Sequence, residues 1–417
     1  MTKRFLAVAG AAVATLGIVA CGGDDNESAS TTTGPAGKLP AGVVLASGKG
    51  APYLPGPGTG KGIGPMVGTP EADKATAAGE AAGKKLGKVE SPPHPTVGWL
   101  DILGGIESAD RATNSARQAL KSVGYGMKYC NGAGDPKKWV TCGNSLLSQD
   151  VKAIMLTGID PPSISPVVQK AKAAGVPVVN CCGLVAPGFD AAFYPDEPRA
   201  GKILAEALKA KLGSDGGDIA VADYPAPWAT KRTDELKRLV KGTNIKIAAS
   251  SVTDPTDLIK GTQKKTTDQL TANPNLKAFW WAFDTAGQAG AQVIKGKYPN
   301  KSFPDRPAAL TFHADPSSQV LMRKGAIDEV VDVNYDTTAW EAVDALVEHF
   351  ARNTRFPGYS DRATYPGIGD PLAYQVVTKD NLPPTGKYVA PRVDGVSYFL
   401  AKWKAEGLLA NDFLLGE

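Results

Sequence analysis

The sequence predicts an α/β fold built from two doubly wound, Rossmann-like lobes, and three observations carry this prediction. Of the 417 residues, 42% are hydrophobic and 21% are charged, which is typical of a globular chain with a large core. From Thr96 onward, short β-branched runs alternate with helical stretches, as in βαβ units on a parallel sheet. The same unit begins again at Asp218, so the chain has enough elements for two lobes.

The first half contains four strands and four helices. The apolar run at 97–103 predicts the first strand, and the helix at 108–123 ends where a glycine follows. The other elements expected in this half are strands at 125–129, 153–156 and 176–179, and helices at 144–149, 164–174 and 198–212.

The second half repeats the pattern. Its expected strands lie at 218–222, 245–250, 278–281 and 309–312, its helices at 228–240, 255–272 and 286–295, and a final strand at 374–377. In open α/β sheets, ligands bind at the carboxyl ends of the strands. We therefore expect a ligand crevice where the strand ends of the two lobes meet.

Residues 1–20 have the features of an export signal. Lys3 and Arg4 form a basic start, and residues 5–19 are apolar but too few for a confident membrane-spanning helix. The sequence around Ala20-Cys21-Gly22 resembles the lipobox of bacterial lipoproteins, so Cys21 is the expected lipidated N-terminus. The protein is thus expected to be exported and lipid-anchored to the cell membrane, facing the periplasm or the cell exterior. An ordinary cleaved signal and an uncleaved anchor are the alternatives.

Residues 21–95 read as a low-complexity tether. About half of the residues between Gly34 and Gly68 are Gly or Pro, and such a composition cannot bury a core. Residues 71–88 are Ala-rich and helical in character, which leaves a short helix as the alternative to the favoured interpretation, a flexible spacer.

The charge and the motifs argue against several other classes. The net charge of +4 falls to +2 once Lys3 and Arg4 are removed, so no nucleic-acid partner is implied. The sequence has neither a Gly-x-Ser-x-Gly nor a His-Glu-x-x-His motif, and His94, His313 and His349 lie in different contexts. We therefore expect no enzymatic activity and no cofactor.

Four cysteines remain after Cys21, and in an exported chain they are expected to be oxidised. A Cys130–Cys142 bridge closing the intervening loop is the favoured choice, which leaves Cys181 and Cys182 to form a vicinal disulfide. Free thiols and crossed bridges are the competing arrangements. No metal site is expected, because Cys181-Cys182 and His313 lack the usual ligand spacing.

Several segments together resemble the type I periplasmic binding proteins, the ribose- and galactose-binding-like substrate-binding proteins of ABC importers. The resemblance rests on the order and spacing of four stretches, 151–156, 173–179, Asp196-Glu197 and 273–279, and covers about residues 96–400. It implies that the chain crosses between the lobes near Asp196, near Asn334-Tyr335 and within 359–389. The first lobe would then be 96–196 with 335–380, the second 197–334, and 381–417 a C-terminal segment returning across the hinge.

The resemblance also implies the mode of action. The lobes would close on a small-molecule ligand and deliver it to ABC transporter permease subunits, with no bond made or broken. We expect a monomer. A cell-surface sensor or interaction lipoprotein with the same fold but no transporter is the alternative.

Positions that bind sugar in this family are mostly changed here. Cys181 and Cys182 stand in place of an Asp-Arg pair, Thr230 falls at the position of a second-lobe arginine, and Phe283 replaces an asparagine. The candidate ligand-binding set is completed by Asp101, Ile106, Glu107, Trp228, Lys231, Asp284, His313, Asp315, Asn334 and Tyr335. A crevice with few polar groups and many aromatic ones favours a flat, aromatic or partly apolar ligand over a simple aldose. The alternative is a shift of one or two residues in these strand ends.

Overall fold

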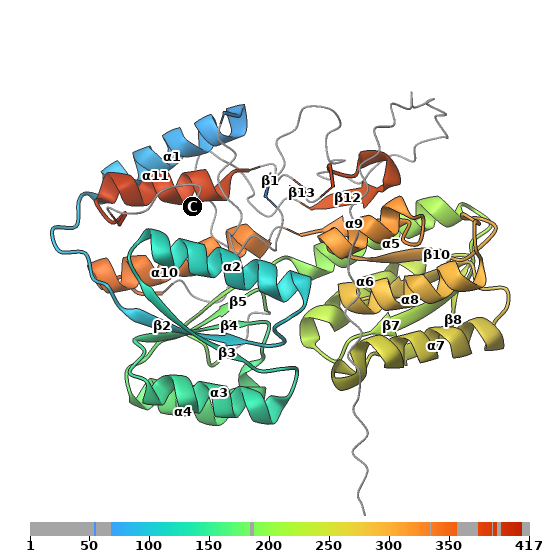
Figure 1. Cartoon of the computed structure of the whole chain (residues 1–417), viewed down its shortest axis with the longest axis horizontal. Coiled ribbons are helices and arrows are strands. Elements are labelled where there is room, and N and C mark those ends of the chain that lie inside the picture. Colours follow the sequence, from blue (N-terminus) through green and yellow to red (C-terminus); the bar gives the residue numbers. More distant parts are fainter. Residues whose placement is uncertain are drawn as a thin grey trace, which may run out of the picture. The chain divides into compact units, whose positions relative to one another are not determined.

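The described residues form two large sheets, each covered by helices on both faces (Figure 1), and a two-stranded pair. The computed structural model describes residues 54–55, 68–183, 187–333, 335–356, 374–385, 387–389 and 393–410. A five-stranded sheet has the order β3-β2-β4-β5-β6, and a six-stranded sheet has the order β12-β11-β10-β9-β7-β8. Both are parallel except for β12, which pairs antiparallel with β11. The predicted α/β class with two doubly wound sheets is confirmed.

The first lobe is built on the five-stranded sheet. Its strands are β2 (Thr96–Asp101), β3 (Gly126–Asn131), β4 (Ala153–Thr157), β5 (Val178–Cys181) and β6 (Ala191–Phe193). Helices α2 (Glu107–Ser122) and α10 (Tyr335–Arg352) pack on one face, and the 3-10 turn η1 (Pro161–Ile164) with helices α3 (Pro136–Ser148) and α4 (Ser165–Ala173) on the other.

The second lobe is built on the six-stranded sheet. Its strands are β7 (Gly217–Asp223), β8 (Ile245–Val252), β9 (Ala278–Trp281), β10 (Ala308–Phe312), β11 (Glu329–Asp332) and β12 (Gln375–Thr378). Helices α5 (Glu197–Leu212) and α6 (Pro227–Val240) cover one face, while α7 (Leu258–Ala272), α8 (Asp284–Lys297) and α9 (Pro316–Arg323) pack on the opposite side. The short elements η2 (Pro255–Asp257), η3 (Lys379–Asn381) and the β1–β13 pair (Leu54–Pro55 with Lys387–Tyr388) complete the described fold.

The structure corrects two expectations for these lobes. Residues 335–380 do not all belong to the first lobe, because β12 pairs with β11 and so extends the second sheet. The short helix expected at 144–149 begins at Pro136, where Asp135 accepts a hydrogen bond from the Lys137 amide and Pro136 occupies the first turn. Both are ordinary helix-start signals that the pattern of apolar residues alone did not reveal.

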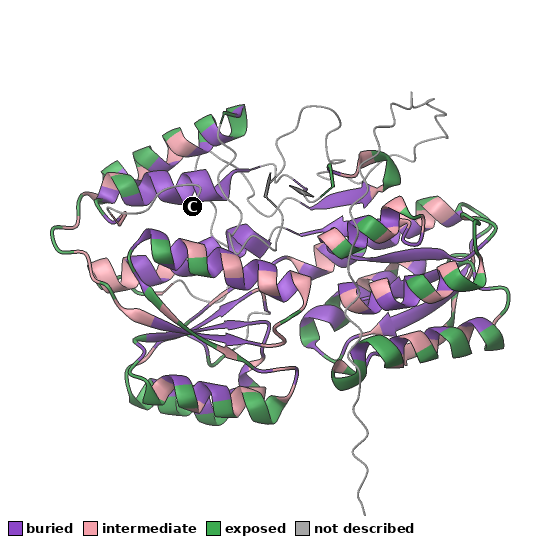
Figure 2. Cartoon of the chain, viewed as in Figure 1, coloured by how far each residue is buried: buried purple, intermediate pink, exposed green. Residues whose placement is uncertain are grey.

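Helix α1 (Pro70–Leu86) is part of the folded body, which corrects the expected flexible spacer at these positions. It lies along α11 (Gly395–Glu406), and its buried residues are Ala72, Ala75, Gly79 and Gly83. Figure 2 shows α11 buried along almost its whole length, while the outer faces of α3, α4 and α7 are exposed. Helix α11 is buried on almost every side, and α1 covers the side that would otherwise face water.

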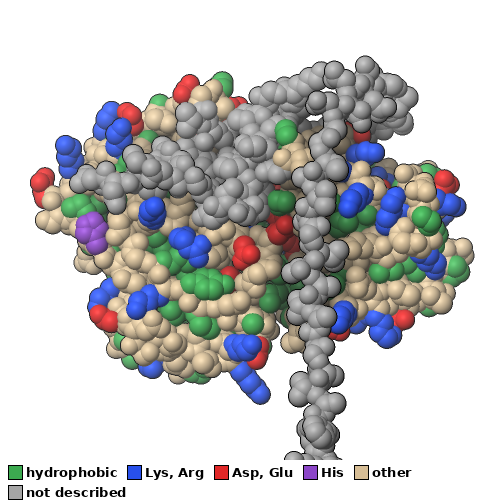
Figure 3. All heavy atoms as spheres, in the orientation of Figure 1, with side chains coloured by type: hydrophobic (Ala, Val, Ile, Leu, Met, Phe, Trp, Pro, Cys, Tyr) green, Lys and Arg blue, Asp and Glu red, His purple; other side chains and the backbone are tan. Residues whose placement is uncertain are grey.

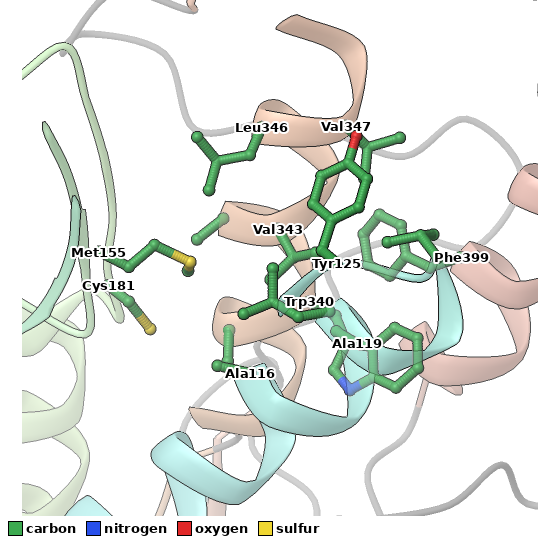
Figure 4. Close-up of a cluster of buried hydrophobic side chains, with 14 of the residues drawn as sticks. Ala116, Ala119, Tyr125, Met155, Cys181, Trp340, Val343, Leu346, Val347 and Phe399 are labelled. Carbon is green, nitrogen blue, oxygen red and sulfur yellow. The ribbon is translucent and has the colours of Figure 1, made fainter. Parts of the chain in front are cut away.

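The core of the first lobe lies between the sheet and the pair α2 and α10 (Figure 4). Trp340, Val343 and Leu346 of α10 face Met155 of β4, and Trp340 stacks on Trp403 of α11 with ring centroids 5.4 Å apart. This packing fixes α2 and α10 on the sheet. It therefore sets the position of the first turn of each helix, from which several site residues extend.

Candidate functional site

A pocket lies where the carboxyl ends of strands from both lobes face each other. The second lobe contributes Tyr224, Trp228 and Phe283, and Cys182 and Tyr335 complete its lining between the lobes. The first lobe contributes mainly aliphatic residues, namely Ile102, Leu103, Ile106, Ala109 and Ala112, together with Ser108 and Thr157. The pocket is thus at the edge where α/β folds bind ligands.

The second-lobe side is an aromatic wall formed by Tyr224, Trp228 and Phe283. Tyr224 follows β7, Trp228 lies in the first turn of α6 after Pro227, and Phe283 precedes α8. The Tyr224 and Trp228 rings are stacked with centroids 5.2 Å apart, and Phe283 lies 4.8 Å from Tyr224 and 5.7 Å from Trp228. Because each ring is held by the other two, the wall is a preformed apolar surface.

Asp101, at the end of β2, organises the first-lobe side of the pocket. Its carboxylate is fully buried and accepts hydrogen bonds from the hydroxyls of Thr113, Thr157 and Tyr129 and from the Leu103 amide. Burial raises the pKa of this carboxyl, and the hydrogen bonds oppose that shift. Asp101 therefore positions Thr157, which lines the pocket, and does not itself line it.

A buried arginine, Arg111 of α2, lies at the junction of the lobes. Its guanidinium donates to Asp336 at 2.8 Å and Asp332 at 3.3 Å, and it lies 3.6 Å from Asp315. Ser115 donates to the other oxygen of Asp336 at 2.7 Å. Arg111 thus ties a first-lobe helix to the end of β11 and to the start of α10.

A second buried arginine, Arg232 of α6, lies behind the aromatic wall. It forms a bidentate pair with Glu197 of α5 and donates to the Ala282 carbonyl at 2.9 Å and to the Tyr335 hydroxyl at 2.9 Å. His313 lies 3.1 Å from the same hydroxyl, and its pKa is held well below the usual range by burial and by the charge of Arg232. A neutral His313 therefore belongs to this network.

Neither arginine was among the candidates, although the sequence holds a signal for both. Arg111 lies next to Ala112 and in helical register with Ser115, and Arg232 lies in register with Trp228 and Leu236. A cation on the buried face of an amphipathic helix must be paired. The second-lobe arginine was expected at Thr230, two residues before Arg232.

Asp284 and Asp315 are fully buried carboxylates with unused hydrogen-bonding capacity. One oxygen of Asp284 accepts from the Thr285 amide at 2.7 Å and from the Thr285 hydroxyl at 3.3 Å. The Asp284 Oδ2 atom and both oxygens of Asp315 have no hydrogen-bond partner. Burial raises the pKa of Asp284 to about 6 and that of Asp315 above its usual range.

Five of the candidate residues line the pocket, namely Ile106, Cys182, Trp228, Phe283 and Tyr335. Asp101, Asp284, His313 and Asp315 are buried and do not line it. The prediction of few polar groups in the crevice agrees with this lining, in which apolar and aromatic side chains predominate, and the buried residues Arg111 and Arg232 do not line the pocket.

The remaining candidates lie elsewhere. Thr230 and Lys231 are on the exposed side of α6, where Thr230 donates to the Ala226 carbonyl. Cys181 is in the first-lobe core, because the alternation along β5 turns its side chain toward Met155. Glu107 hydrogen-bonds Ser317 of the second lobe, and Asn334 is outside the described residues.

The cysteines are partly as expected. Cys130 and Cys142 form the predicted disulfide, with Cα atoms 5.6 Å apart. Cys181 and Cys182 are free thiols with their sulfurs 2.8 Å apart, which corrects the expected vicinal bridge. The chain turns sharply after β5, where Cys182 has a φ of 62°, so Cys181 faces the core and Cys182 faces the pocket.

The charges on the surface, the possible metal ligands and the character of the helices bear on other classes of function. On the face drawn in Figure 3, Lys and Arg side chains are scattered among acidic, hydrophobic and uncharged ones. Within the described part of the chain, His, Cys, Asp and Glu side chains form no group of three arranged to hold a metal ion. No helix within those same residues has both the length and the apolar character needed to cross a membrane.

Comparison with known proteins agrees with this arrangement. The family profile described as "Periplasmic binding protein domain" matches residues 103–354, more than half of the chain. The protein belongs to this family of periplasmic binding proteins, whose members are non-enzymatic solute-binding proteins. The expectation that the chain is not an enzyme is therefore confirmed by its family.

Individual relatives are distant. The D-allose-binding periplasmic protein of Escherichia coli (strain K12) is 26% identical over 207 residues, which are 47% of this chain and 63% of that protein, so the match spans less than two thirds of the relative. An ABC transporter solute-binding protein from Burkholderia graminis C4D1M in complex with D-arabinose has a TM-score of 0.61 at 21% identity, covering 71% of this chain and 99% of the other. A solute-binding protein from Mycobacterium smegmatis with bound glycerol has a TM-score of 0.60 at 18% identity, covering 72% and 100%.

Proposed function

We propose that the protein is an extracytoplasmic solute-binding lipoprotein that captures a small, sugar-like molecule between its lobes and delivers it to the permease of an ABC transporter. The observation that carries the ligand class is the aromatic wall of the pocket, which Asp284 directly follows in the chain; Asp284 and Asp315 are buried outside the pocket lining and have unused acceptor atoms. The D-allose and D-arabinose in the names of the relatives support the same class.

A sugar ring matches both features of this site. Its C–H face packs on aromatic rings, while its hydroxyls donate to carboxylates, which form stronger hydrogen bonds than neutral acceptors. Hydroxyls bound by Asp284 and Asp315 would satisfy oxygens that otherwise have no hydrogen-bond partner. The role of the site is selective capture, because the family holds its solutes without making or breaking a bond.

The aliphatic residues that the first lobe contributes to the pocket restrict the class of ligand further. Ile102, Ile106 and Ala109 offer no hydrogen bond from their side chains, so hydroxyls pointing toward them would lose their water without replacement. We therefore favour a sugar-like molecule with an apolar substituent or a planar group over an aldose with hydroxyls on all sides.

The test is a thermal-shift screen followed by titration calorimetry on the chain from residue 22 onward. The panel holds D-allose, D-arabinose, a 6-deoxyhexose, a phenyl glycoside and a nucleoside. A ligand at 100 times its dissociation constant stabilises the folded protein by about 2.7 kcal/mol, which such a screen detects. We expect stabilisation by a 6-deoxy or aryl-bearing sugar, and weaker binding of plain aldoses.

Variants assign the binding to this pocket. Asp315→Asn is expected to weaken the hit about 10- to 100-fold, because a hydrogen bond to a charged group contributes about 1.5–3 kcal/mol. Trp228→Ala removes one ring of the aromatic wall and should weaken binding as well. Lys231→Ala is the matched control, since Lys231 is exposed on the same helix as Trp228. Equal affinities in all four proteins would reject the pocket as the binding site.

The lipid anchor is a separate part of the proposal. It rests on the signal-like residues 1–20 and on Cys21, which are outside the described residues. Expression with an alkyne-bearing fatty acid should label the wild-type protein and place it in the membrane fraction. Cys21→Ser should abolish both labelling and membrane association. A labelled Cys21→Ser variant would exclude Cys21 as the acylated residue.

A further inference from the structure

The first two turns of α2 reach the second lobe at two residues. Glu107 accepts from the Ser317 amide at 3.0 Å and from the Ser317 hydroxyl at 2.8 Å. One turn later, Arg111 lies 3.6 Å from Asp315. Each of these contacts joins the two lobes directly.

The Glu107 contact is a helix cap supplied from the other lobe. Helix α9 begins at Pro316, and its own N-cap residue, Asp315, makes no capping hydrogen bond with its side chain. The amide of Ser317 is one of the donors that a helix leaves without an intrahelical partner, and Glu107 accepts from it. The negative charge of Glu107 at this end of α9 also interacts favourably with the helix dipole.

We propose that Glu107 caps α9 across the lobe boundary and that this contact stabilises the closed arrangement of the lobes. Glu107 was expected to bind ligand, but both of its oxygens are occupied by Ser317, and neither residue lines the pocket. Glu107 is thus a positioning residue. It raises ligand affinity by increasing the population of the closed, binding-competent form. This inference goes beyond the proposed function, because it concerns closure and not the ligand.

The experiment measures the distance between the lobes in the unliganded protein. Lys138 of α3 and Lys260 of α7 are exposed, one on each lobe, and are replaced by p-azidophenylalanine for spin labelling, which leaves the native cysteines untouched. Pulsed dipolar spectroscopy then gives the ratio of closed to open populations. The proteins compared are the wild type, Glu107→Ala, Glu107→Gln, Ser317→Ala and the exposed control Glu90→Ala.

We expect a closed population in the unliganded wild type. Glu107→Ala should lower the closed-to-open ratio about 2- to 30-fold, the range that loss of a helix cap gives. Glu107→Gln keeps an acceptor but loses the charge. Its closed-to-open ratio should lie between those of the wild type and Glu107→Ala. Ser317→Ala removes the hydroxyl alone, and combining it with Glu107→Ala should add little to the single change, because the two residues share one contact.

Two results would overturn the inference. The first is an unliganded wild type that is open, and the second is a Glu107→Ala protein with the same ratio as Glu90→Ala. Far-ultraviolet circular dichroism and the melting temperature of each variant establish that it is folded. Since no ligand is added, this test is independent of whether any sugar binds.

Discussion

Replacing Gly79 with valine tests whether α1 is docked on α11 as part of the folded body. A Cβ atom at this position would lie 2.1 Å from the Tyr398 carbonyl oxygen and 3.1 Å from the Ala401 Cβ atom. Heavy atoms do not approach a Cβ atom closer than about 3.0 Å, so α1 would have to move outward by about 1 Å. The obstacle is backbone of α11, which cannot rotate aside as a flexible side chain would.

The expected cost follows from two opposing effects. Valine has a slightly higher helix propensity than glycine, which favours the variant by roughly 0.3 kcal/mol. Overpacking a close interface typically costs about 1–3 kcal/mol, and contact with backbone places Gly79→Val at the upper end of that range. We therefore expect a net loss of roughly 2 kcal/mol in the docking of α1. A loss of this size increases the undocked population about 30-fold.

Hydrogen exchange followed by mass spectrometry measures the undocked population of α1 directly. Peptides from residues 70–86 should exchange about 30-fold faster in Gly79→Val, and trypsin should cleave sooner at Lys84 or Lys85, which are exposed. Gly296→Val is the matched control, because Gly296 is a helical glycine with open space around its Cβ position. If Gly79→Val protects residues 70–86 as well as Gly296→Val does, the docking of α1 on α11 is refuted.

Two further predictions concern stability. The double change Cys130→Ser and Cys142→Ser should lower the free energy of unfolding by about 2–4 kcal/mol in urea titrations. If the variant and the wild type have the same urea midpoint under oxidising conditions, the bridge does not form. Burial raises the pKa of Asp284 to about 6. Between about pH 4 and 6 the folded protein therefore holds a proton on Asp284 that the unfolded chain has lost. The free energy of unfolding should fall as the pH rises through this window. Asp284→Asn should flatten that dependence in urea titrations at pH 5 and 7, and a slope equal to that of the wild type would contradict this assignment.

The alternation of strands and helices could be predicted from the sequence because each element carries its own local pattern. The run Ala278 to Trp281 is buried at every position, as a central parallel strand requires, and its apolar composition marks it clearly. Elements that lack a clear local pattern were not predicted. Strands β6 and β11 have three and four residues, too few to establish a periodic pattern, and β12 was assigned to the wrong sheet because pairing depends on residues distant in sequence.

The docking of α1 could not be predicted because its sequence alone gives no reason for burial. Residues 70–86 are rich in Ala, Gly and Lys, which is compatible with a solvated helix. The reason for its burial lies more than 300 residues away in α11, whose apolar residues are too many for a single buried face. A helix with no polar side requires a partner. Gly79 and Gly83 then explain why that partner can approach so closely.

The candidate site was predicted apart from its two buried arginines, and the physics of burial explains the difference. Aromatic residues at strand ends can be assigned from position alone, and Trp228 and Phe283 do line the pocket. A buried arginine is tolerated only where acidic partners arrive from other elements, as Glu197 of α5 does for Arg232. Their assembly at the lobe junction means that opening the lobes must also rearrange the charges around Arg111. Ligand capture and interlobe electrostatics are therefore coupled in this protein.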